Sequence, residues 1–210
     1  KDGPATLSTA LEQQPPSQGM ARSALSILAA SGRRDSQLAV ILDRVAGVTT
    51  GTPATVEDIP ALAKAVRQHG DPVAGRAIYE RESLACVNCH ATDGTPGKIG
   101  PDLSALGTAQ TVEFILGAIL DPQKEVKEGF VAHEIETRKG DVHQGYLRGD
   151  GDGEVSLYDH LTQRVLRFRN AEIDLPRQLG SLMPAGLADS LTREELRDLV
   201  AYLARLGRRD

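Results

Sequence analysis

The sequence predicts a mainly α-helical protein with a small inserted antiparallel β unit and an N-terminal helical segment. Two kinds of periodicity lead to this prediction. Apolar residues recur at helical spacing in segments 72–82, 111–120 and 192–206. Between residues 130 and 169 they alternate with polar residues, which is typical of half-buried strands. The chain has 210 residues, of which 40% are hydrophobic, so it can bury the core of one large or two ordinary domains.

Composition excludes several classes of protein. The net charge is −5, which disfavours a nucleic-acid surface. No apolar run reaches the roughly 18 residues that a membrane span needs, so we expect no span in this chain. Aromatic residues make up 3% of the chain and Trp is absent, so a large flat cofactor could fill part of the core.

Residues 1–70 differ in character from the rest. Segment 1–19 is rich in Gln, Pro and Ser and is expected to be extended. Segments 20–30, 36–46 and 56–68 are expected to be helices. Paired short helices of this kind resemble the end of a HEAT-type repeat array, and a simple helical extension packed on the following domain is the alternative. We place the boundary near residue 70, with a second domain at 71–210.

The only two cysteines of the chain form the motif Cys86-Val87-Asn88-Cys89-His90. Two cysteines three positions apart followed by His are the attachment signature of a c-type haem. Each thiol can add to one haem vinyl group, and the adjacent His then lies below the iron. A thioredoxin-like redox pair or half of a zinc site are the alternatives. We expect one covalent haem c, held by Cys86, Cys89 and His90.

Gly100-Pro101-Asp102 follows the motif by ten residues and resembles a segment of class I cytochromes c. The resemblance implies that the Pro101 carbonyl accepts a hydrogen bond from the ring N–H of His90. Such a bond would direct Nε2 of His90 towards the iron. An ordinary turn is the alternative.

The sixth iron ligand is expected to be Met183, one of only two methionines. It lies in the segment Met183-Pro184 before the last helix, and this segment resembles the distal loop of class I cytochromes c. A core role for Met183 is the alternative. Four histidines are rival ligands, namely His69, His133, His143 and His160.

The predicted helices are similar to the framework of the same family. In class I cytochromes c the first and last helices cross where a small residue meets an aromatic ring, and Gly75 with Tyr202 matches this arrangement. The resemblance therefore implies the class I cytochrome c fold as the mainly α framework.

Met183 lies 93 positions after His90, and a β insert at about 129–174 accounts for most of this length. Strands are expected at 130–138, 142–148, 154–158 and 164–169. We expect the insert to lie beside the Met183 face of the haem and to cover one of its edges. The acidic, Gly-rich stretch 149–154 is expected to be a hairpin turn rather than a calcium loop.

With this insert, residues 71–207 resemble the Pirellula/Verrucomicrobium-type haem-binding domain. The resemblance is carried by short blocks in order along the chain: 86–90, 99–103, 119–122, 129–130, 139–141 with Gly145, 183–187 and 199–203. The resemblance implies a C-terminal haem domain of a larger, periplasmic or otherwise extracytoplasmic protein.

The predicted function is one-electron transfer by a monohaem cytochrome c, whose iron is bound by His90 and Met183. The redox partner would be another protein or a fused dehydrogenase domain, and the chain would not be an enzyme by itself. The alternative is a haem enzyme or a sensor of peroxide or gas with a labile sixth ligand.

Overall fold

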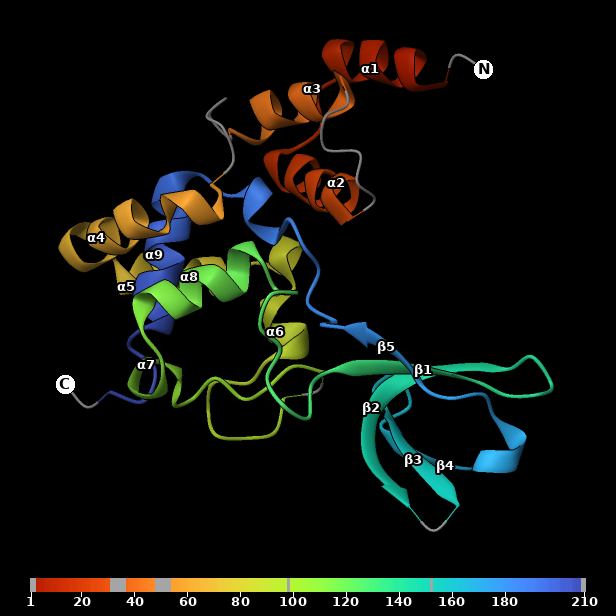
Figure 1. Ribbon diagram of the computed structural model, residues 1–210. Helices are drawn as coiled ribbons and strands as arrows, with labels where there is room; N and C mark the ends of the chain where they lie inside the picture. Colours follow the sequence, from red (N-terminus) through yellow and green to blue (C-terminus); the bar gives the residue numbers. More distant parts are fainter. Residues whose placement is uncertain (1–2, 31–36, 48–53, 98, 152, 209–210) are drawn as a thin grey trace.

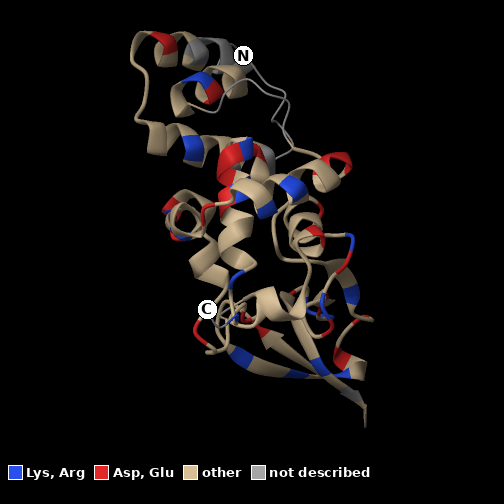
Figure 2. Cartoon of the chain, turned by 90° about the vertical axis from the view of Figure 1, so that its left-hand side faces the viewer, with Lys and Arg blue, Asp and Glu red and all other residues tan. Residues whose placement is uncertain are grey.

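The computed structural model describes residues 3–30, 37–47, 54–97, 99–151 and 153–208 (Figure 1). Three N-terminal helices lie at one end of the molecule, a group of helices lies in the middle, and an antiparallel sheet lies at the other end. Within the described ranges no helix is both long and apolar enough to cross a membrane. Basic and acidic residues are interspersed along the helices and the sheet (Figure 2).

The N-terminal helices are α1 (Gly3–Gln13), α2 (Gln18–Ala30) and α3 (Gln37–Ala46). They surround a small core of their own that consists of Ala21, Leu25, Ala39, Leu42 and Ala46. The predicted extended conformation of segment 1–19 is wrong, because α1 occupies most of it. Its Ala, Leu, Gln and Glu residues favour a helix, and Leu11 packs against the small core. A relation to HEAT repeats stays a prediction.

The middle layer contains four longer helices: α4 (Ile59–His69), α5 (Pro72–Tyr79), α8 (Val112–Leu120) and α9 (Arg193–Leu203). Short elements connect them: η1 (Val56–Asp58), η2 (Glu82–Leu84), α6 (Cys86–Cys89), α7 (Leu106–Ala109) and η4 (Leu187–Ser190). Buried side chains of α4, α5, α8 and α9 form one cluster. Since α4 belongs to this cluster, the predicted boundary at residue 70 does not coincide with a division of the hydrophobic core.

Helices α5 and α9 cross at a glycine. A Cβ atom on Gly75 would collide with the main-chain carbonyl of Asp198 and would lie 2.8 Å from Cβ of Tyr202. The side chain of Asp198 accepts a hydrogen bond from the N–H of Asp71, the N-cap residue of α5, at 3.0 Å. The predicted crossing of a small residue with an aromatic residue is therefore present.

The sheet has five antiparallel strands in the order β4-β3-β2-β1-β5. They are β1 (Ala132–Glu136), β2 (Val142–Gly151), β3 (Glu154–Asp159), β4 (Arg164–Arg169) and β5 (Arg177–Gly180), with the turn η3 (Asn170–Glu172) before β5. One face buries a separate cluster of Ile135, Val155, Leu157 and Ile173. The four predicted strands are confirmed.

The predicted fold class is wrong. The structure is 47% helical and 18% strand, which makes it a mixed α/β protein rather than a mainly α cytochrome c fold with a minor insert. The sheet has one strand more than expected, because β5 follows the predicted end of the insert at residue 174 and continues to Gly180. Strand β5 lacks a run of alternating apolar residues, and it forms by pairing with β1 at the sheet edge.

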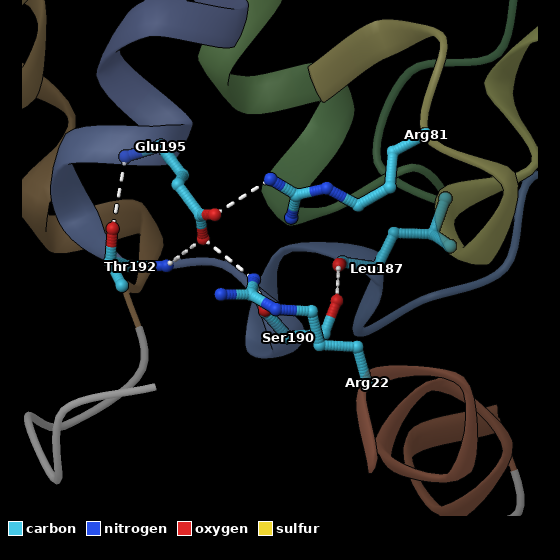
Figure 3. A network of polar contacts seen from close by, with 6 residues as sticks. All are labelled: Arg22, Arg81, Leu187, Ser190, Thr192 and Glu195. Atoms are coloured by element: carbon cyan, nitrogen blue, oxygen red, sulfur yellow. Dashed lines mark hydrogen bonds and ion pairs between the residues drawn. The ribbon is translucent and has the colours of Figure 1, made fainter. Parts of the chain in front are cut away.

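A polar network joins α2 to the middle layer (Figure 3). The carboxylate of Glu195, in the first turn of α9, binds Arg22 of α2 at 2.9 Å and Arg81 at 2.7 Å. It also accepts from the N–H of Thr192 at 3.0 Å, which completes the capping box of α9. Arg22 additionally donates to the carbonyl of Ser190 at 3.2 Å. The network therefore fixes the N-terminal helices to the start of α9.

Candidate functional site

The two cysteines lie on a single helical turn. A single residue, Ala85, separates η2 from α6. Its φ of 56° lies in the left-handed region, and α6 begins at the next residue. Cys86 and Cys89 therefore stand at positions i and i+3, on the same side of the turn. Neither forms a disulfide, both are half-buried, and Cys86 packs against the central core.

Burial keeps both thiols protonated. It raises the pKa of Cys86 to about 11 and also raises the pKa of Cys89. A redox-active pair of the thioredoxin kind needs the opposite shift, because the thiolate is the nucleophile. The environment of these cysteines is therefore that of structural thiols and not of an activated redox pair.

His90 directly follows α6 and is held by two hydrogen bonds to residues outside this helical turn. Its ring Nδ1 lies 2.8 Å from the carbonyl oxygen of Pro101. Since a carbonyl only accepts, Nδ1 carries the proton and Nε2 keeps a free lone pair. The main-chain carbonyl of His90 accepts from the hydroxyl of Tyr79 at 3.1 Å. Burial lowers the pKa of His90, although the Pro101 hydrogen bond partly opposes this effect, so the ring is neutral at pH 7.

Gly100 packs directly on the imidazole. A Cβ atom there would collide with the ring and would stand 2.6 Å from its Nδ1. The N–H groups of Ile99 and Gly100 both donate to the carbonyl of Cys89, at 3.2 and 2.9 Å. The loop after the motif is thus folded back onto it, and this brings Pro101 to His90. The predicted relation between His90 and Pro101 is present.

Tyr146 of β2 also reaches this loop, and sequence reasoning missed it. Its hydroxyl donates to the carbonyl of Ile99 at 2.8 Å, and its side chain is 3% exposed. We expected the insert beside the Met183 face, whereas this hydrogen bond joins it to the loop on the His90 side. An aromatic residue at an inward strand position was visible in the sequence, but its partner 47 positions earlier was not.

Met183 lies in the loop between β5 and η4. Its side chain is half-buried and packs against the same central core as Cys86. The loop is anchored at Ser181, which exchanges two hydrogen bonds with the side chain of Gln123 at 2.9 and 3.0 Å. The Ser181 hydroxyl also accepts from the N–H of Met183 at 3.1 Å. A role for Met183 as an iron ligand stays a prediction.

The rival histidines lie elsewhere. His69 is exposed at the end of α4. In the sheet, Nδ1 of His133 bonds the Val131 carbonyl at 3.0 Å, and the ring of His143 packs on Phe168 with centroids 5.1 Å apart. His160 is near Tyr146, with ring centroids 6.3 Å apart, and its buried Nδ1 has no hydrogen-bond partner among the described residues.

The donor set fits a covalently attached haem. Two free thiols on one turn can form thioethers, and the neighbouring imidazole has the tautomer that an iron ligand needs. In the described ranges, no group of three or more His, Cys, Asp or Glu side chains could hold a metal ion. A haem iron does not require such a group, because the porphyrin supplies four of its ligands.

No family model matches this chain, and a search of curated proteins gave no match.

Proposed function

We propose that this chain is a monohaem c-type cytochrome that transfers single electrons. The hydrogen bond from His90 Nδ1 to the Pro101 carbonyl, beside two unpaired thiols on one helical turn, is the observation that carries the proposal. The motif resembles that of class I cytochromes c, and we propose that residues 71–207 belong to the Pirellula/Verrucomicrobium-type haem-binding domains.

Each residue has a distinct role in this proposal. Cys86 and Cys89 would hold the haem covalently: each thiol would add across one vinyl group, so that the S–H bond and the C=C π bond give way to one C–S and one C–H bond. His90 would bind the iron through Nε2, and the Pro101 carbonyl holds the orientation of its ring. Met183 would bind the iron through its thioether sulfur. When bound, the haem iron accepts or donates one electron, and a thioether ligand raises its potential.

The surroundings of the motif support exchange of electrons with a partner protein. Val87, between the two cysteines, has 41% of its surface exposed, so the attachment segment lies at the molecular surface. Haem is attached to such motifs outside the cytoplasm, which is why we propose a periplasmic or otherwise extracytoplasmic protein. We propose that it accepts electrons from a dehydrogenase, present either as a separate protein or as a fused domain.

Denaturing mass spectrometry tests the proposal. Protein from a host that matures c-type cytochromes should have the mass of the polypeptide plus one haem, and its reduced spectrum should have the sharp α band of low-spin haem c. A variant with both Cys86→Ala and Cys89→Ala should have the mass of the polypeptide alone. Wild-type protein with the mass of the bare polypeptide would contradict the proposal.

A further inference from the structure

One peptide group links the sheet to the axial histidine. The carbonyl of Ile99 accepts from the Tyr146 hydroxyl at 2.8 Å, and the N–H of the same peptide group, on Gly100, donates to the Cys89 carbonyl at 2.9 Å. Hydrogen bonds on both ends of one peptide polarise it and strengthen each other. The orientation of this peptide plane therefore depends on a side chain of β2.

The same peptide plane determines the position of the His90 ring. Cα of Gly100 faces the imidazole so closely that no side chain fits between them. The next residue, Pro101, supplies the carbonyl that accepts from His90 Nδ1. A rotation of the Ile99–Gly100 peptide would change both the packing on the ring and the direction of the Pro101 carbonyl.

Tyr146 is itself held rigidly. Its ring packs edge-on against Phe130 with centroids 5.5 Å apart, and the Arg148 guanidinium lies 5.9 Å from its centroid. Burial and the neighbouring Cys89 raise its pKa to about 12, although Arg148 opposes this. The hydroxyl is therefore protonated at neutral pH and can donate its hydrogen bond to Ile99.

We propose that Tyr146 is a positioning residue for His90, and that the sheet sets the strength of the His90–Pro101 hydrogen bond through the Ile99–Gly100 peptide. This inference rests on the proposed haem function. A firm Nδ1–H···O bond makes Nε2 more basic and favours Fe(III). Tyr146 therefore lowers the reduction potential relative to a protein that lacks its hydroxyl.

Tyr146→Phe in the haem-loaded protein tests the inference, since Phe keeps the ring and removes only the hydroxyl. Exchange of the Gly100 N–H and of the His90 Nδ1–H, followed by NMR in the reduced protein, should accelerate about fivefold, which corresponds to loss of one hydrogen bond of about 1 kcal/mol. The reduction potential should rise. Neither change is expected if Tyr146 only fills space.

Tyr158→Phe is the matched control. Tyr158 stands opposite Tyr146 in the pairing of β2 with β3, and Arg148 also lies over its ring. Its hydroxyl forms no hydrogen bond with any of the residues that the structure describes. The potential and both exchange rates should therefore stay at the wild-type values.

The outcomes separate the two proposals. Wild-type protein without covalent haem overturns both of them. Haem-loaded Tyr146→Phe with unchanged potential and exchange overturns only the role of Tyr146. If Tyr146→Phe does not fold, NMR of the haem-loaded wild type tests the role of Tyr146. The proposal requires a slowly exchanging Tyr146 hydroxyl proton close to Gly100. A wild-type spectrum without this proton overturns the proposal.

Discussion

Glu195→Gln should destabilise the protein much more than an equivalent change at the surface. The Glu195 side chain is 20% exposed and lies between Arg22 and Arg81, which are 15% and 26% exposed. Gln keeps the size of the side chain and an oxygen for the Thr192 N–H, so the cap of α9 is largely retained. The charge is lost, and two half-buried guanidinium groups remain without their shared partner (Figure 3).

The expected loss lies between two limits. Removal of one partner of a fully buried pair costs about 3–5 kcal/mol, whereas an exposed pair contributes about 0.2–1 kcal/mol. Glu195 retains a fifth of its exposure, so we expect a loss of about 2 kcal/mol. In a protein of this size that corresponds to a decrease of the melting temperature by about 4–8 °C.

Urea unfolding at several pH values measures this loss. Burial would raise the pKa of Glu195, but the Thr192 N–H, Arg81 and Arg22 outweigh it, so the pKa lies below its ordinary value. A carboxyl group with a lowered folded-state pKa stabilises the protein above its unfolded pKa of about 4.3, and this contribution disappears as the pH falls through the folded value. The wild type and Glu195→Gln should therefore differ most above about pH 5 and converge in acid.

Glu113→Gln is the control. Its partner is Arg67 at 2.6 Å, but the two side chains are 45% and 53% exposed, so the loss should stay below about 1 kcal/mol. Equal losses for the two variants, or a difference between wild type and Glu195→Gln that does not depend on pH, would refute the reasoning from burial.

Three further predictions concern the proposed haem site and the helix crossing. Met183→Ala should abolish the weak near-infrared charge-transfer band of sulfur ligation in the ferric protein and lower its potential, and an unchanged spectrum would exclude Met183 as the ligand. Gly100→Ala should displace the His90 ring and reduce the fraction of protein with attached haem, measured by mass spectrometry. Gly75→Ala should cost about 3 kcal/mol in thermal or urea unfolding, because the methyl group meets the rigid main chain of α9. Gly149→Ala is the control for both glycine variants, because its added methyl group meets open space. It should change neither the fraction of protein with attached haem nor the free energy of unfolding. Equal effects at Gly149 would show that steric overlap does not cause the losses at Gly100 and Gly75.

The local contacts of the candidate site could be predicted from the sequence. Cys86, Cys89 and His90 are contiguous, and a short loop carries Pro101 back to His90, so their relation depends on few residues. Tyr146 could not be predicted in the same way. Its contact with Ile99 depends on the register of β2 and on how the sheet meets the loop, and neither is encoded in local spacing.

The sequence by itself determined the local elements, because side-chain periodicity, caps and glycines act over a few residues. It thus predicted the four central helices, the four strands β1 to β4 and the crossing at Gly75. Only the tertiary structure decided the balance between helix and sheet, the helical state of α1 and the placement of α4 in the central core. Strand β5 and α1 have weak local signals, so pairing and burial against distant residues stabilise them.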